Sequence, residues 1–215
     1  MAGHVKTRQY HSKVRDVRAL ATRQRIREAA AELFVDRGYA TTTVADIAAK
    51  AGVVSKTIYL AFPTKLALFN EVIGVALGGD DEQVKVRDRD WFQQTQEAAP
   101  AEMPALFARF TAALHVRSAA LLEAADASAG ADPELAVRRE LGRENRRADM
   151  HRIAEPYAAK SGRDLRYTTD MLYTLGSASV YALLVFQSGW TSKEYEAWLA
   201  GALADALLNG PDKNP

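Results

Sequence analysis

The stretch "TTTVADIAAKAGVVSKTIYLAF", residues 41–62, holds two short helical patterns separated by a single glycine, Gly52. In the second pattern, apolar residues recur on one side, and hydrogen-bond donors occupy the other. The apolar residues are Val53, Ile58 and Phe62, and the donors are Ser55, Lys56, Thr57 and Tyr59. Glycine allows a tight turn with positive φ at no steric cost. The stretch therefore predicts two short helices, the second with one face for the core and one face for a polar partner.

The flanking residues extend this pattern into a compact unit. Apolar residues at helical spacing predict a helix from about Thr22 that ends at Gly38. Thr43 is the expected N-cap of the next helix, and Lys65 opens a further one after Pro63. Three helices joined by tight turns form a compact unit, and the two that flank Gly52 have the helix-turn-helix arrangement. In DNA-binding proteins of this kind, the helix after the turn enters the major groove of DNA. The alternative is an ordinary helical hairpin with a polar outer face.

The charge distribution favours a polyanion partner for the N-terminal third. Residues 1–65 hold 12 Lys and Arg against 5 Asp and Glu, a net charge of +7, whereas the remainder carries −6. A basic module joined to an acidic remainder suggests nucleic-acid binding, although a chance cluster of charge in solvent is the alternative. Residues 1–21 are read as a flexible basic arm that either follows the minor groove or stays in solvent. Its basic residues are Lys6, Arg8, Lys13, Arg15 and Arg18.

The stretch "TRQRIREAAAELFVDRGYATTTVADIAAKAGVVSKTIYLAFPTKLALF", residues 22–69, resembles the N-terminal domain of the tetracycline-repressor (TetR) family of bacterial transcription regulators. The resemblance implies a homodimer that reads two DNA half-sites through residues 22–68. Residues 69–215 would then bind a small effector and dimerise. The residues that it assigns to DNA contact are Thr42, Thr43, Val54, Ser55, Lys56, Thr57, Tyr59 and Lys65.

Val54 departs from the family pattern, which often has a capping serine at this position. A valine side chain cannot cap a helix. Either Ser55 caps a helix whose start is shifted, or Val54 contacts a thymine methyl group.

The remainder of the chain predicts further helices and no strands. The expected order is a loop or broken helix over 78–102, a helix over 103–123, a linker over 126–133, a charged helix or helix pair over 134–159 and two long helices over 164–187 and 193–208. The fold class is therefore all-α, with about nine helices.

The helix from Met103 carries an apolar stripe beside a polar one, which is the composition that a ligand pocket needs. The candidate ligand-binding residues are Phe107, Phe110, Thr111, Leu114 and His115. The alternative places the aromatic residues in the core and leaves His115 partly exposed.

Small residues on the last two long helices permit close helix approach, and the resemblance implies that these helices pair across a two-fold axis. The candidate interface residues are Gly176, Ala197, Gly201, Ala204 and Leu208. The alternative is packing within one chain.

Several site classes are not expected. The chain has no cysteine, so disulfides and thiolate metal sites are excluded. We expect no signal peptide, transmembrane helix, metal site or cofactor, because no matching run or spacing occurs. No catalytic motif is present either, so an enzyme built on a helical scaffold is the weakest reading.

The sequence thus predicts a cytoplasmic, ligand-responsive DNA-binding regulator without a membrane partner. We expect a repressor that binds a palindromic operator as a dimer and is released when an effector moves the fourth helix. The alternatives are a TetR-like activator and an architectural DNA-binding protein without an effector.

Overall fold

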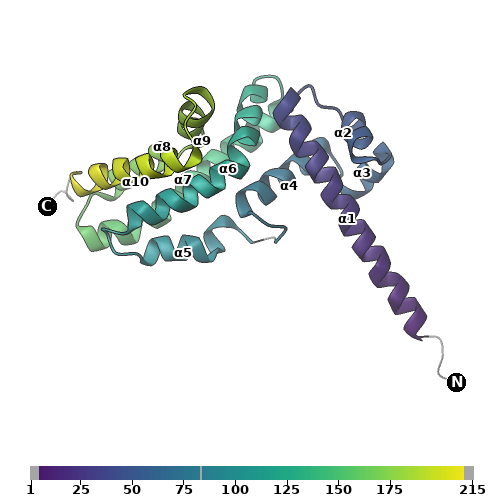
Figure 1. Ribbon diagram of the computed structural model, residues 1–215, viewed down its shortest axis with the longest axis horizontal. Coiled ribbons are helices and arrows are strands. Elements are labelled where there is room, and N and C mark those ends of the chain that lie inside the picture. The colour runs from purple at the N-terminus through teal and green to yellow at the C-terminus, as the bar shows by residue number, and fades with distance from the viewer. Residues whose placement is uncertain (1–4, 83, 211–215) are drawn as a thin grey trace. The chain divides into compact units, whose positions relative to one another are not determined.

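The computed structural model describes residues 5–82 and 84–210, and over these residues it is all-helical, without strands (Figure 1). This confirms the predicted fold class, with ten α-helices rather than about nine. The chain divides into two compact units, Met1–Val72 and Ile73–Pro215. The division falls inside one helix, α4, so the chain passes from one unit to the other without a loop.

The N-terminal unit contains α1 (Val5–Arg37), α2 (Val44–Ala51), α3 (Ser55–Ala61) and the first half of α4 (Lys65–Gly78). Its core is formed by apolar side chains that the helical spacing singled out. They include Ile26, Ala30, Leu33, Phe34, Ile47, Ile58, Phe62, Leu68 and Phe69. The rings of Phe34, Tyr39 and Phe69 meet in edge and tilted contacts with centroids 5.1–5.5 Å apart. This aromatic cluster joins α1, the following loop and α4.

The local signals at the helix ends are confirmed. Gly38 follows α1 with φ 83°, and Gly52 ends α2 with φ 66°, a left-handed conformation in which glycine is favoured. Thr43 caps α2 in a reciprocal arrangement with Asp46: each side chain bonds the backbone N–H of the other residue.

The start of α1 differs from the prediction of an arm over residues 1–21. The structure continues α1 back to Val5, and residues 1–4 lie outside the described part. The segment from Val5 to Arg37 contains neither glycine nor proline, and it holds seven Arg and five Ala, which favour helix. Side chains 17–21 on this extension are exposed.

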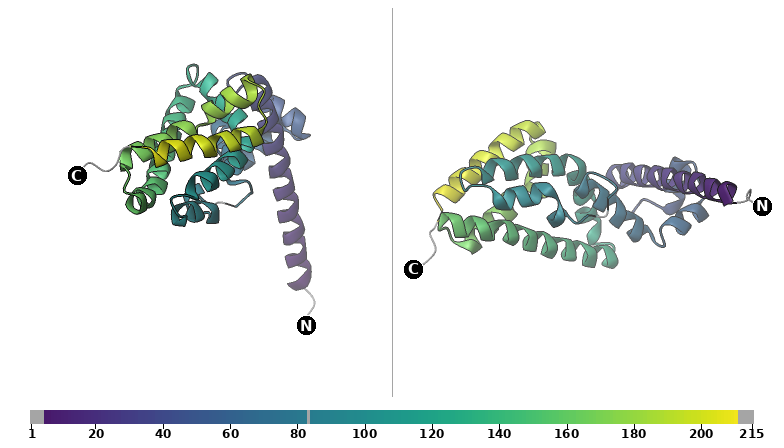
Figure 2. Two further views of the ribbon diagram at one scale, coloured as in Figure 1. Left: turned by 60° about the vertical axis from the view of Figure 1, so that its left-hand side comes forward. Right: turned by 90° about the horizontal axis from the view of Figure 1, so that it is seen from below.

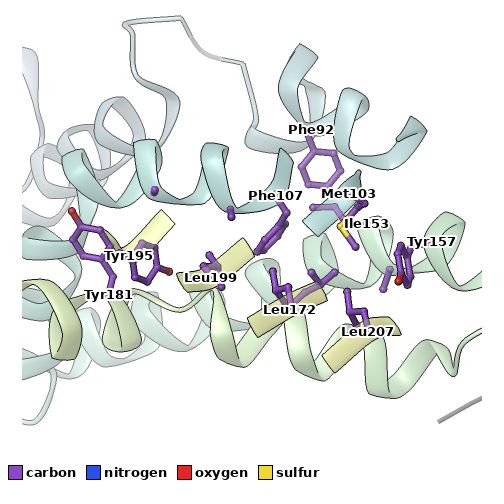
Figure 3. Packing of buried hydrophobic residues seen from close by; sticks show 14 of the residues in the cluster. Phe92, Met103, Phe107, Ile153, Tyr157, Leu172, Tyr181, Tyr195, Leu199 and Leu207 are labelled. Atoms are coloured by element: carbon purple, nitrogen blue, oxygen red, sulfur yellow. The ribbon is translucent and has the colours of Figure 1, made fainter. Parts of the chain in front are cut away.

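The C-terminal unit is a bundle in which α6 packs against both α7 and α10 (Figures 1 and 2). Its elements are a short 3₁₀ turn η1 (Val86–Asp88), α5 (Asp90–Glu97), α6 (Met103–Ala129), α7 (Pro133–Ser161), α8 (Leu165–Leu175), α9 (Ala178–Tyr181), a π-helix η2 (Ala182–Gln187) and α10 (Ser192–Leu208). Figure 3 shows side chains of several of these helices meeting in one core. That core includes Phe92, Met103, Phe107, Ile153, Tyr157, Leu172, Tyr181, Tyr195, Leu199 and Leu207.

Two expected elements are corrected. The single helix predicted over 164–187 breaks at Gly176, after which Ser177 caps α9 by accepting a bond from the Val180 N–H at 3.2 Å. The linker predicted over 126–133 is shorter, because α6 runs to Ala129 and α7 begins at Pro133.

Helix α6 is long and apolar enough to span a membrane by length and composition, and two bent helix pairs meet the same description if each is counted as one span. From the sequence we expected no such segment. In the structure, 44% of the apolar window of α6 is buried inside the bundle. The apolar side of α6 therefore serves the core of the helical unit.

Candidate functional site

Helix α3 presents the polar face that the sequence predicts. Ile58 and Phe62 are 1% and 2% exposed and anchor the helix in the core. On the opposite side, Lys56 and Tyr59 are exposed. In the described part of the chain, no other residue engages the polar side-chain groups of Ser55, Lys56, Thr57 and Tyr59. These donors are therefore available to a partner, and their contact with DNA stays a prediction.

Val54 occupies the N-cap position of α3 and makes no side-chain capping bond. Ser55 is the first helical residue, so the alternative in which Ser55 caps a shifted helix is wrong. The Val54 side chain is 67% exposed, beside the donors of α3. Leu60, farther along the helix, is 81% exposed. Contact between Val54 and an apolar group, such as a thymine methyl, therefore stays a prediction.

Thr43 is exposed at the start of α2, where its hydroxyl donates to Asp46 Oδ2 at 2.6 Å and accepts from the Asp46 N–H at 3.1 Å. The hydrogen bonds from Thr43 hold the pKa of the Asp46 carboxyl below its usual value. Thr43 thus orders the beginning of α2, and its predicted phosphate contact remains a prediction.

Thr42 is wrong as a DNA contact. Its side chain is fully buried, and its hydroxyl donates to the carbonyls of Leu33 at 3.0 Å and Gly38 at 2.8 Å. The hydroxyl therefore binds the carbonyl groups at the C-terminal end of α1 instead of facing solvent.

Lys65 is tied to the same loop. Its ammonium donates to the carbonyls of Tyr39 at 2.9 Å and Thr42 at 3.2 Å, and it lies 4.2 Å from the centroid of the Tyr39 ring. Lys65 therefore holds the α1–α2 loop that presents Thr43. Its predicted phosphate contact stays a prediction.

An ion-pair cluster that the sequence analysis missed joins α1, α3 and α4. Arg23 makes a two-pronged contact with Glu71, with Nε 2.6 Å from Oε1, and its Nη1 donates to the carbonyl of Ala61 at 2.9 Å. The guanidinium also lies 4.2 Å from the centroid of the Phe62 ring. Arg27 adds a second cation, 3.1 Å from Glu71 Oε1. The end of α3 is thus fastened to α1 and α4 together.

The predicted ligand-binding residues divide between core and surface. Phe107 and His115 are each 3% exposed, whereas Phe110, Thr111 and Leu114 are half-buried. The Phe110 ring packs beside Trp91 at 5.5 Å and beneath the Arg109 guanidinium at 4.7 Å. A surface depression in this unit is lined by residues of α7 and of the segment 164–169, and none of the five candidates borders it.

His115 is buried, so the alternative of a partly exposed histidine is wrong. Its Nε2 lies 3.0 Å from the Gly176 carbonyl, while its Nδ1 has no partner among the described residues. Burial lowers the pKa of His115 to about 4, so the ring is neutral at pH 7. Because a carbonyl can only accept, Nε2 carries the proton and Nδ1 is an unused acceptor.

Gly176 is wrong as a dimer contact, because it lies in the core beneath α6. A Cβ atom added there would be 2.8 Å from the Phe107 ring and 3.0 Å from the Leu172 carbonyl oxygen, so a side chain would require the ring to shift. The remaining candidates lie on α10, where Ala197 and Gly201 are exposed, Ala204 is half-buried and Leu208 is 50% exposed. Their spacing places them on one side of the helix, and their role in dimerisation stays a prediction.

Over the described residues, no group of three or more His, Cys, Asp or Glu side chains could hold a metal ion.

Known proteins share both the N-terminal domain and the overall fold of this chain. Residues 26–72 match the family model described as bacterial regulatory proteins, tetR family. No curated protein matches the chain. A transcriptional regulator of the TerR/AcrR family from Aquifex aeolicus is similar in fold, with a TM-score of 0.63 and 19% identity over 85% of this chain and 97% of that one. The regulator FadR from Bacillus subtilis, solved in complex with stearoyl-CoA, has a TM-score of 0.61 and 19% identity over 87% of this chain and 98% of that one.

Proposed function

We propose that the chain is a DNA-binding transcriptional repressor that binds a palindromic operator as a homodimer, with residues 26–72, which match the tetR family model, as its DNA-binding part. A small-molecule effector releases it. The observation that carries the proposal is α3, a short helix anchored by two buried apolar residues, with unengaged donors on its exposed face. The net charge of +7 on residues 1–65 supplies the attraction to phosphate.

The mechanism rests on the spacing of two copies of α3. Half-sites one turn apart are about 34–36 Å from centre to centre, so a shift of a few ångströms removes one set of contacts. The chain crosses between its units inside α4. In this helix, Lys65 holds the α1–α2 loop. Glu71 binds Arg23, which in turn holds the end of α3. Movement of α4 on effector binding would therefore displace the DNA-reading face. Nearly complete release needs about 10⁴-fold different effector affinities for the two states.

The effector is assigned to residues 73–215. FadR, which has the same fold, was solved with stearoyl-CoA, and this supports a small-molecule ligand in the helical unit. We assign no catalytic activity to the chain, and a cytoplasmic location fits its role.

The first prediction concerns the shape of the operator. Selection from a random DNA pool with the full chain should recover an inverted repeat, because each copy contributes one α3 helix. Sequencing of the bound fraction measures this. An architectural protein without an effector would recover unrelated sequences, and that result would overturn the proposal. Activation and repression are separated by transcription in vitro from a promoter that carries the selected site.

The second prediction separates two lysines. Lys56→Ala should change the preferred base at one position of each half-site, a discrimination of about 1–3 kcal/mol. Lys65→Ala should weaken binding to all sequences alike and reduce the salt dependence by about one unit of slope. Operator titrations at four salt concentrations measure both. Wild-type affinity and slope in both variants would place the DNA face elsewhere, and weaker binding by Lys65→Ala at an unchanged slope would restrict Lys65 to holding the loop.

A further inference from the structure

The interior of the C-terminal unit holds a group of polar side chains with unused hydrogen-bonding capacity. Tyr195 of α10 is fully buried, and its hydroxyl has no partner among the described residues. The His115 ring lies 6.4 Å from the Tyr195 ring and has the unused acceptor Nδ1. Leaving buried polar atoms unpaired is costly, so such atoms call for an explanation.

Arg146 of α7 brings a positive charge to the same group. Its Nη2 donates to the carbonyl of Tyr173 at 2.6 Å, and the guanidinium lies 4.4 Å from the Tyr173 ring. Within the described residues, no carboxylate forms an ion pair with it, in contrast to the neighbouring Arg147, which pairs with Asp170 at 2.6 Å. Arg146 binds the Tyr173 carbonyl, and His115 lies beside the Gly176 carbonyl three residues later, so both side chains meet the end of α8. Burial lowers the pKa values of Arg146 and His115 and raises the pKa of Tyr195, and the positive charge of Arg146 opposes the last of these shifts.

The surroundings of this group are aromatic and apolar. The Tyr181 ring lies 4.8 Å from Tyr195 and 5.4 Å from His115, and Trp198 lies 6.0 Å from Tyr195. Leu199 follows on α10, and Phe107 faces it from α6 in the same core (Figure 3). Tyr181 immediately precedes the π-helix η2, an irregular element that often marks functional sites.

We propose that Arg146 and Tyr195 anchor the carboxylate of an apolar acid, which is the chemical class of the effector. The guanidinium and the phenol each donate to the carboxylate, a pairing that supplies the missing counter-charge. The apolar body of the acid lies among the aromatic and leucine side chains of α6 and α10. His115 Nδ1 offers an acceptor for an N–H or O–H group on the same ligand. This inference rests on the proposed effector function of residues 73–215.

Two tyrosines of this core form a matched pair for the test. Tyr157, at the other end of the core in Figure 3, is also buried with an unpartnered hydroxyl. Tyr157 also lies within electrostatic reach of a cation, Arg163, which binds the carbonyls of Leu208 and Gly210. What distinguishes Tyr195 is the unused acceptor of His115 beside it and an Arg146 that has no carboxylate partner among the described residues. Tyr195→Phe and Tyr157→Phe each remove one unpartnered hydroxyl, so both variants should fold.

The probes are decanoate and 1-naphthoate, each compared with its alcohol, 1-decanol or 1-naphthalenemethanol. Binding is followed by tryptophan fluorescence, since Trp198 adjoins Tyr195. We expect at least one acid to bind the wild-type chain about tenfold or more tightly than its alcohol. Tyr195→Phe should weaken the binding of that acid by about tenfold. Tyr157→Phe should leave its affinity unchanged.

The charge is tested by a second pair of variants. Arg146→Gln should abolish the preference for acid over alcohol, whereas Arg147→Gln, one residue along on the surface, should retain it. Thermal melting establishes that each variant is folded. The proposal is overturned if neither acid binds, if acid and alcohol bind equally, or if Tyr195→Phe or Arg146→Gln binds the acid like wild type. If the chain selects an operator but binds no acid, this inference fails and the proposed DNA function stands. If it binds an acid but selects no operator, the proposed DNA function fails instead.

Discussion

The Gly201→Arg variant is expected to be a folded monomer that has lost most of its affinity for the operator. Gly201 lies exposed on α10, and a Cβ atom added there meets nothing within 4 Å in its own chain. The fold of one chain therefore accommodates an arginine. In a close helix contact with a second copy, the same arginine would bury an unpaired charge, which costs several kcal/mol. Losing the second half-site should reduce operator affinity by about 10²–10⁴-fold.

Light scattering measures the mass of this variant, and titration of the selected operator measures its affinity. Ala159→Arg provides the control, because it adds the same side chain at an exposed position of α7. The control should remain a dimer with wild-type affinity. A dimeric Gly201→Arg with full affinity would remove α10 from the interface.

The N-terminal unit could be predicted in detail because its signals are local. Gly38 and Gly52 take positive φ, and Thr43 pairs with Asp46 only three residues away. Such signals depend on the chemistry of a few neighbouring residues. The apolar spacing from Ile26 to Phe34 likewise places the buried side of α1 without knowledge of its partners.

The roles of individual polar residues could not be predicted in the same way, because they depend on distant partners. Thr42 reads as a surface hydroxyl, yet it binds the Leu33 carbonyl nine residues away inside the unit. Arg23 and Glu71 are 48 residues apart, and no local pattern connects them. Gly176 suggests close helix packing, which is correct, but the neighbour that needs the space is Phe107 of the same chain.

The breaks in the C-terminal unit show a similar limit. Apolar periodicity across 164–187 favours a continuous helix, and only the cap at Ser177 and the packing of Gly176 end it. For α1, in contrast, charge suggested an arm, whereas helix propensity without glycine or proline extends the helix to Val5.

Glu71→Gln is expected to loosen the attachment of α3 and to lower the stability of the N-terminal unit by about 2 kcal/mol, between the values for exposed and buried ion pairs. Glu71 accepts from both Arg23 and Arg27, and its side chain is 22% exposed. A glutamine leaves two cations facing each other without their common carboxylate. Arg23 also holds the carbonyl of Ala61 at the end of α3, so operator affinity should fall by about tenfold with every base preference unchanged. Glu32→Gln is the control, because Glu32 is 62% exposed and pairs, within the described part of the chain, with Lys50 alone, and it should cost less than about 0.5 kcal/mol.

The pH dependence of this difference distinguishes charge from packing. Burial raises the pKa of Glu71, but hydrogen bonds from Arg23 and Arg27 outweigh it and hold the pKa below its ordinary value of 4.5. A lowered pKa means that the stabilisation is fully present above pH 4.5 and is lost as the pH falls through the folded-state value.

Amide hydrogen exchange of peptides within residues 55–72 should therefore show faster opening in Glu71→Gln than in wild type at neutral pH, and this difference should shrink in acid. If Glu71→Gln and Glu32→Gln exchange alike at neutral pH, the cluster does not hold α3. If the difference persists unchanged well below pH 4, it arises from packing, and the carboxylate charge does not contribute.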